Sequence, residues 1–344
     1  MWTLWHSVRG KVPLHLDTSV KLFKTLVRSG MEYAIAIWGI LASAAELKRL
    51  DDVQIEFGRL LLRMPDNVAR PYILRELGLE SLRERSEVSA LGLFGHLAEL
   101  GDNRLSGYIF RKCCDEVDRG GARLSWCAAM KPCLQKYPLF HSRGVWQSRS
   151  PIPDWKQRVH EVCRGEFTAD SDKQIHGMSS LSVFAELRPS ESRGWLHRCL
   201  RHYGAEIRFK LRAGVLPLMN TICASRHKDI EKENRWCLLC ETREVEDASH
   251  FVCVCPVFAA ERSKCLAKIA DTVAAVSAAV SLRSAMQLGN TVALLLGDSM
   301  LAELPPDTQL KVDRIVCNFL KVAWRKREGL WQKHCIDGDP WQLR

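Results

Sequence analysis

The sequence predicts a mainly α-helical fold that includes one small segment organised by cysteine and histidine side chains. Apolar residues recur at three- and four-residue steps through residues 14–100 and again beyond residue 193, which is the period of an amphipathic helix. Cysteine and histidine gather between residues 237 and 255, at the short spacings that tight turns present to a metal ion. The chain has 344 residues, of which 47% are hydrophobic and 26% charged, so we expect a globular protein of two or three domains.

The N-terminal region predicts a bundle of helices joined by short connections. Four helices are expected, at about residues 20–38, 47–64, 71–78 and 82–100. Ser43 and Glu46 form the capping box that opens the second helix, and Pro65 stops it. Residues 1–110 are therefore predicted to form one helical domain.

The helical pattern weakens in the middle of the chain. Residues 111–192 contain Gly120-Gly121 and several prolines, which interrupt regular structure. The aromatic side chains between them can pack a small core. We predict an irregular connecting region with short helices over residues 111–192. A third region follows over residues 193–344, with a basic helix, the cysteine and histidine segment and further helices.

The last predicted helix opens at Pro305-Pro306-Asp307 and ends on the basic triplet Arg325-Lys326-Arg327. Two interpretations of this triplet stay open. Its cations can contact phosphate groups, or they can be the favourable cationic end of a helix.

Composition and charge limit the compartment and the kind of partner. Lys and Arg exceed Asp and Glu by 50 to 40, and this excess of +10 suits a polyanionic partner. We expect no secretory signal after Met1 and no membrane partner, because the longest run of low charge, residues 272–282, is too short to span a bilayer. The 14 cysteines of such a chain predict a reducing intracellular compartment, nucleus or cytoplasm.

A basic helix is predicted over residues 196–213, ending at Gly214. Between residues 193 and 240 there are ten Lys and Arg against four acids, a difference of +6. We predict that cations of this helix contact nucleic-acid phosphates. The predicted contacts are Arg198, Arg201, Arg208, Lys210 and Arg212. The alternative is an ordinary solvated surface that Glu206 partly neutralises.

The cysteine and histidine segment predicts a structural zinc site. Its ligands are Cys237, Cys240, His250 and Cys255, with nine residues between the second and the third. Cys253 is a competing ligand, because His250 and Cys253 also have a usable spacing. Four protein ligands leave no position for water, so the site is expected to be structural. Trp236, beside the first ligand, is predicted to stack on a base or to belong to the small core of the knuckle.

Several stretches resemble the region downstream of the polymerase palm in reverse transcriptases of LINE-type (non-long-terminal-repeat) retrotransposons. They are Leu22–Tyr33 with Trp38-Gly39, Leu50–Gln54 through Arg63–Pro65, Glu76–Arg83, Phe209–Gly214, Cys237–Pro256, Leu294–Gly297 and Phe319–Arg327. The resemblance implies a thumb-like helical domain, a C-terminal zinc knuckle with Cys255 as the last ligand, and RNA or DNA as the partner. It implies no small-molecule substrate.

The family's polymerase chemistry needs paired aspartates on a strand hairpin, and we expect no activity for this chain alone. Its one Asp-Asp pair, Asp51-Asp52, falls inside a predicted helix and is expected on a solvated face. Three functions stay open. The chain binds nucleic acid without catalysis, or it is a zinc-stabilised helical scaffold, or it is part of an RNA-directed DNA polymerase whose palm is encoded upstream.

Overall fold

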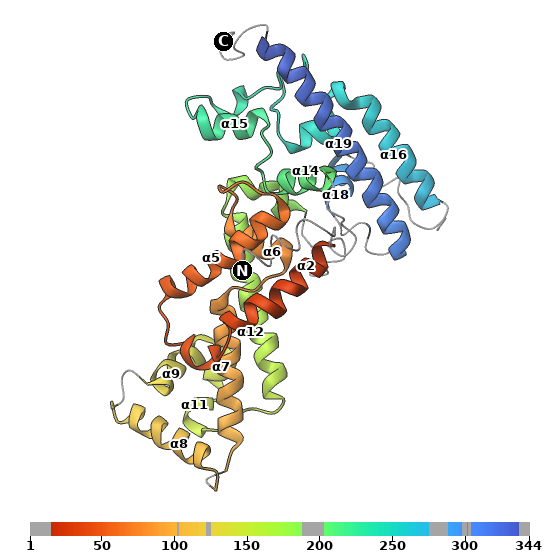
Figure 1. Cartoon of the computed structure of the whole chain (residues 1–344). Coiled ribbons are helices and arrows are strands. Elements are labelled where there is room, and N and C mark those ends of the chain that lie inside the picture. Colours follow the sequence, from red (N-terminus) through yellow and green to blue (C-terminus); the bar gives the residue numbers. More distant parts are fainter. Residues whose placement is uncertain are drawn as a thin grey trace. The chain divides into compact units, whose positions relative to one another are not determined.

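The computed structural model describes residues 15–101, 103–121, 125–187, 203–274, 288–297, 301 and 304–336. This described part is mainly helical, and its β-type pairing is limited to one antiparallel bridge between Trp236 and Val245 (Figure 1). None of its helices combines the length and the hydropathy needed to cross a membrane. The chain divides into two compact units. The first unit contains Met1–Lys21, Gly58–Leu77 and Ile175–Arg344, and the second contains Leu22–Phe57 and Gly78–Gln174. Each unit is therefore built from separate stretches of the sequence, whereas the predicted regions are consecutive.

The second unit is a helical assembly with an aromatic core. Its helices are η1 (Phe23–Arg28), α3 (Ser29–Met31), α4 (Ile35–Trp38), most of α5 (Ala44–Leu62), α7 (Leu82–Glu99), α8 (Leu105–Asp118), α9 (Trp126–Lys136), α10 (Pro138–Ser142), α11 (Val145–Ser148) and most of α12 (Trp155–His176). The ring of Phe94 packs edge-on against Phe110, with 5.4 Å between centroids. Trp155 lies over Gly95, where a Cβ atom would come within 2.0 Å of the indole. Gly95 therefore lets α12 approach α7 closely.

All four helices predicted for the N-terminal region are present. The capping box is formed as expected, since the Ser43 amide donates to the Glu46 carboxylate across 2.8 Å and the Glu46 amide donates to the Ser43 hydroxyl across 3.3 Å. The first predicted helix is divided into α2 (Leu16–Leu22), η1, α3 and α4. Its break lies at Ala34, which has a left-handed φ of 53°. An apolar stripe does not reveal such a break, because the stripe resumes in register after it.

Two sequence-based predictions differ from the structure, one in the middle of the chain and one at Asp51 in α5. Residues 111–192 contain α12, a helix of 22 residues, and are more regular than expected. Its buried positions include Trp155, Val159 and Cys163, at steps of four residues. Most other residues of α12 are polar, so this apolar stripe is weak in the sequence. Asp51 is buried and not solvated. Its carboxylate accepts hydrogen bonds from the Leu82 amide and the Gln54 side chain, both across 2.8 Å, and so holds the start of α7.

The first unit is organised around the long C-terminal helix α19 (Figure 1). Besides most of α2, its helices are α6 (Arg70–Leu77), η2 (Ser179–Leu181), α13 (Ser182–Glu186), α14 (Tyr203–Arg212), α15 (Met219–Arg226), η3 (Lys232–Asn234), η4 (His250–Val254), η5 (Pro256–Phe258), α16 (Ala259–Ala274), α18 (Leu288–Leu296) and α19 (Pro306–Ile336). Both α14 and α16 pack along α19. A Cβ atom at Gly204 would lie 1.8 Å from the carbonyl oxygen of Cys317, so a glycine is needed where α14 meets α19.

The last predicted helix is confirmed, but its end is not at the basic triplet. Helix α19 continues to Ile336. Arg327 is buried inside the unit, and Lys326 pairs with Glu261 across 2.8 Å. The triplet is therefore an interior part of the helix, and two of its three cations are held by carboxylates.

Candidate metal centre

A short hairpin positions the first two cysteines. Beside the bridge of Trp236 with Val245, the Cys237 amide donates to the Glu244 carbonyl across 2.9 Å. The Glu246 amide donates to the Arg235 carbonyl across 3.0 Å on the other side of the bridge. Cys237 and Cys240 therefore lie at the closed end of this hairpin, where the chain reverses.

A single turn of π-helix positions the other two donors. The His250 amide donates to the Asp247 carboxylate across 2.8 Å, which starts η4. The Cys255 amide then donates to the His250 carbonyl across 2.8 Å, a five-residue step that closes the π turn. Pro256 begins η5 directly afterwards and stops the turn from continuing. His250 and Cys255 are thereby held near each other at the two ends of η4.

The four predicted ligands come together in the structure. The donor atoms of Cys237, Cys240, His250 and Cys255 all lie within 4.8 Å of one another, and this group could bind a metal ion. Three of the residues are buried, and Cys240 is partly exposed. Cys253, the competing ligand, is buried but does not belong to the group. Among the described residues the geometry therefore favours Cys255 as the fourth donor.

A carboxylate outside the group orients the histidine ring. The Glu244 carboxylate lies 3.0 Å from His250 Nδ1, whereas His250 Nε2 lies 3.4 Å from the Cys240 sulfur. With a proton on Nδ1 donated to Glu244, the lone pair of Nε2 points into the group. Histidines that bind metals commonly have such an acceptor behind them.

The close packing of the donors shifts their pKa values apart. Hydrogen bonding to Cys255 raises the pKa of Cys237 to about 12, and the same contact lowers the pKa of Cys255. Burial opposes protonation of His250, but hydrogen bonds with Cys237 and Glu244 outweigh it and raise the pKa of the imidazole to about 9. The four donors therefore compete for the same protons, and a bound cation would have to displace those protons.

Buried Glu246 connects the hairpin to the rest of the first unit. Its carboxylate accepts from the guanidinium of Arg327, across 2.7 and 2.8 Å, and from the Met219 amide, across 2.8 Å. Its carbonyl accepts from the Asn220 amide across 3.2 Å. The donor group is thus tied to the start of α15 and to α19.

The two aromatic residues beside the ligands have different environments. Phe251 is fully buried and packs edge-on against Phe258, with 5.0 Å between ring centroids. Trp236 is half-buried, and its indole N–H donates to the Glu233 carbonyl across 2.6 Å. The Arg243 guanidinium lies 5.8 Å from the centre of the Trp236 ring. Trp236 is therefore a surface residue that accepts a cation against its ring.

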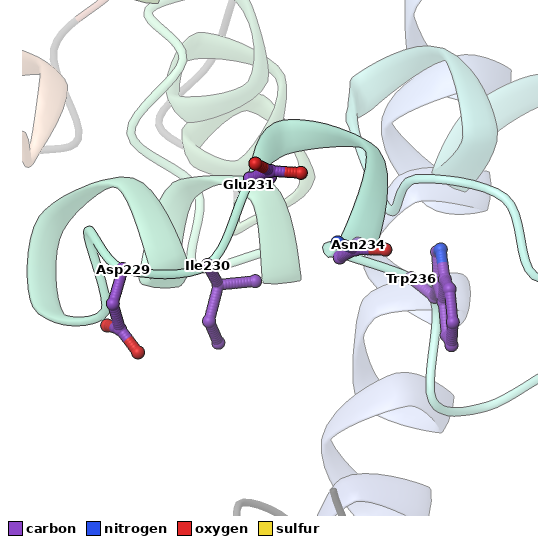
Figure 2. Close-up of a pocket in the computed structure, with 5 residues that line it drawn as sticks. All are labelled: Asp229, Ile230, Glu231, Asn234 and Trp236. Atoms are coloured by element: carbon purple, nitrogen blue, oxygen red, sulfur yellow. The ribbon is translucent and has the colours of Figure 1, made fainter.

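An open pocket lies beside Trp236, as Figure 2 shows. Its other lining residues are Asp229, Ile230, Glu231 and Asn234. Arg235 holds the segment of residues 229–234 in place, because its guanidinium donates to the Ile230 carbonyl across 3.1 Å. Two carboxylates, those of Asp229 and Glu231, line this pocket, so its wall is unfavourable for an anion.

The structure corrects two of the predicted nucleic-acid contacts and leaves the others as predictions. Arg198 and Arg201 lie outside the described residues, and Lys210 is half-buried. For Arg208 and Arg212 the prediction is wrong, because both are buried. Arg208 pairs with Asp313 across 2.9 Å and also donates to the Gly297 carbonyl. Arg212 pairs with Glu76 across 3.0 Å. The periodic pattern placed these arginines away from the apolar stripe, but it could not show that distant carboxylates cover them.

The described part of the chain is mainly helical and contains a Cys₃His donor group that could bind a metal ion. Comparisons with protein-family models, curated proteins and solved structures find no match to this chain.

Proposed function

We propose that the donor group binds one structural Zn²⁺ and that the unit around it binds RNA or DNA, as the C-terminal region of a reverse transcriptase of the LINE type would. The observation that carries the proposal is the convergence of Cys237, Cys240, His250 and Cys255 at the closed end of a hairpin and the two ends of one π turn. That hairpin also presents Trp236 and Arg243 together at the surface.

The donor chemistry supports zinc. Three thiols and one imidazole are the soft and intermediate donors that Zn²⁺ prefers, whereas calcium and magnesium prefer oxygen. A group of four protein donors completes a tetrahedron, which is typical of a structural ion and not of a catalytic one. The burial of Cys237, His250 and Cys255 and the carboxylate behind His250 fit the same role.

The hairpin surface supports nucleic-acid binding. The half-buried ring of Trp236 can stack on a base, and the exposed guanidinium of Arg243 can reach a phosphate. The chain's excess of +10 favours a polyanion. Most contacts are expected to involve phosphate, so sequence specificity should be weak.

A second candidate function is a zinc-stabilised helical scaffold for another protein. The burial of Arg208 and Arg212 favours it, because two cations expected at a nucleic-acid surface belong to the core of the first unit. Under this alternative the metal stabilises the fold and the chain has no affinity for a polyanion.

Metal analysis of the purified chain under reducing conditions tests the site. One zinc per chain is expected, lost in Cys240→Ser and retained in Cys253→Ser, because Cys253 lies outside the donor group. Absence of zinc from the wild-type chain, or equal zinc in both variants, would contradict the proposal.

Fluorescence anisotropy with a labelled single-stranded RNA and a labelled DNA duplex, over a series of salt concentrations, tests the partner. Affinity should fall steeply as salt rises. Trp236→Ala should weaken binding to the single strand, where bases are free to stack, whereas Phe167→Ala in the second unit should not. An affinity that does not depend on salt, or no binding at all, would favour the scaffold.

A further inference from the structure

Helix α19 has one buried face and one exposed cationic face. Its buried positions include Val312, Val316, Phe319, Leu320, Ala323 and Trp324. The opposite face carries Lys311, Arg314 and Arg325, which are exposed, and Lys321, which is partly exposed. Asn318 is exposed between them. The apolar face is covered by α14 and α16, so the cationic face is turned away from the core of the first unit.

These side chains form one row along the helix. The positions 311, 314, 318, 321 and 325 follow each other at steps of three and four, so they stay on one side of an α-helix. With a rise of about 1.5 Å per residue, Lys311 and Arg325 are about 21 Å apart along the axis. A strand of a duplex carries one phosphate per about 3.4 Å of axis, so a row of this length spans about six phosphates. A small compact anion could contact only one or two of these cations.

The charges of this row are available to a partner. Among the described residues, no carboxylate pairs with Lys311, Arg314, Lys321 or Arg325. The neighbouring cations of α19 are paired, Lys326 with Glu261 and Arg327 with Glu246. Arg325 lies with its guanidinium 5.9 Å from the centre of the Tyr203 ring, whose hydroxyl donates to the Glu328 carboxylate across 3.5 Å.

We propose that Lys311, Arg314, Lys321 and Arg325 form a binding surface for the phosphate backbone of a nucleic acid, with Asn318 donating to the same backbone. This inference rests on the proposed nucleic-acid function. It identifies the surface that should contribute most of the affinity for the nucleic acid. The charge complementarity of a linear row and a linear polyanion supports this occupant. An anionic membrane fits less well, because helices that lie on membranes expose apolar side chains beside their cations, and here the apolar face of α19 is buried.

The test replaces all four cations by glutamine in the full chain, as K311Q, R314Q, K321Q and R325Q. Glutamine is a good helix former, so α19 should remain helical. The matched control replaces Arg119, Arg143, Lys156 and Lys173, four exposed cations of the second unit, and changes the net charge by the same amount. Circular dichroism and zinc content verify that both variants are folded.

Binding of a labelled DNA duplex and a labelled single-stranded RNA is then measured between about 50 and 200 mM salt. Each lost phosphate contact reduces affinity by roughly fivefold near physiological salt, so the loss of four contacts should reduce affinity by roughly 600-fold. The magnitude of the slope of log affinity against log salt should fall by about 2.8 to 3.6, at roughly 0.7 to 0.9 per contact. The control should bind like the wild-type chain.

Each outcome separates this surface from the proposed function. A selective loss in the row variant supports the surface. If the wild-type chain binds and both variants bind equally well, or lose equally, the surface is wrong and the proposed function stands. No binding by the wild-type chain overturns both. Binding of the wild-type chain to vesicles of phosphatidylserine but to neither nucleic acid also overturns both.

Discussion

The guanidinium of Arg327 donates to both carboxylate oxygens of Glu246, across 2.7 and 2.8 Å, and joins α19 to the hairpin of the donor group. The side chains are 4% and 1% exposed, so the pair is withdrawn from solvent. A buried charge that loses its partner is costly, whereas an exposed pair contributes little. Removing the buried pair of Arg327 should therefore lower the free energy of unfolding more than removing the partly exposed pair of its neighbour Lys326.

Replacing Arg327 by glutamine should destabilise the first unit by about 3–5 kcal/mol, because it leaves the Glu246 carboxylate buried without a cation. Lys326→Gln is the matched control. Its pair with Glu261 is partly exposed, so the loss should be no more than about 1 kcal/mol. Urea unfolding measured by circular dichroism compares the two variants, and equal losses would show that burial of the Arg327 pair has no energetic consequence.

Replacing Glu244 by alanine should weaken metal binding about 10–100-fold, since it removes the acceptor behind His250 Nδ1. The control is Glu241→Ala on the same hairpin, an exposed residue with no contact to the donor group. Competition with a chromophoric zinc chelator measures both affinities. Unchanged affinity in Glu244→Ala would mean that the ring of His250 is oriented without the carboxylate.

Replacing Arg212 by glutamine should destabilise the first unit by about 3–5 kcal/mol, because Glu76 would remain buried and uncompensated. Lys210→Gln on the same helix should cost roughly 0.5 kcal/mol or less, since Lys210 is half-buried and makes no ion pair with a described residue. Thermal and urea unfolding check the difference. A folded Arg212→Gln variant of unchanged stability that no longer binds nucleic acid would restore the phosphate contact expected from the sequence.

The second unit should become less stable as the pH rises from about 4.5 to 7. Burial is the largest cause that raises the pKa of Glu84 from 4.5 to about 7. The folded state therefore favours the protonated acid, and its stabilising effect is present below pH 4.5 and is lost as the pH rises through 7. At about 1.4 kcal/mol per pH unit over about 2.5 units, the change in the free energy of unfolding is at most about 3.5 kcal/mol.

The variant Glu84→Gln keeps an oxygen that can accept from the Ser81 amide but cannot ionise, so its stability should vary less over this pH range. Asp118 does not interfere. Hydrogen bonds from Lys131, Trp146 and Arg149 lower the pKa of Asp118, so its contribution is lost only at lower pH. Urea unfolding at several pH values, monitored by tryptophan fluorescence, measures the stability of both proteins. Identical pH profiles for the wild-type chain and Glu84→Gln would contradict this prediction.

The helices of the N-terminal region could be predicted because their signals are local. The capping residues Ser43 and Glu46 act within one turn, and apolar steps of three and four reveal a buried face. Ala34 gave no such signal, since alanine is not a residue that favours the left-handed region it adopts here. The length of α12 was not predicted, because its apolar positions are few among polar residues.

The donor group could be predicted because the residue types of the ligands and their spacing are both properties of the sequence. The choice of Cys255 over Cys253 depended on a resemblance, and the π turn that closes between His250 and Cys255 supplies its physical reason. The burial of Arg208 and Arg212 could not be predicted from the sequence. Their partners, Asp313 and Glu76, lie more than a hundred residues away, and burial of a charge depends on such distant pairs.

The two faces of α19 should accept mutation very differently over evolutionary time. Changes at Lys311, Arg314, Lys321 or Arg325 should cost little folding free energy, typically within about 0.5 kcal/mol at an exposed site. Changes at Phe319, in the buried face, create cavities that cost several times more. A lineage could therefore lose, strengthen or redirect the charge of this surface by single substitutions while the scaffold beneath it stays the same.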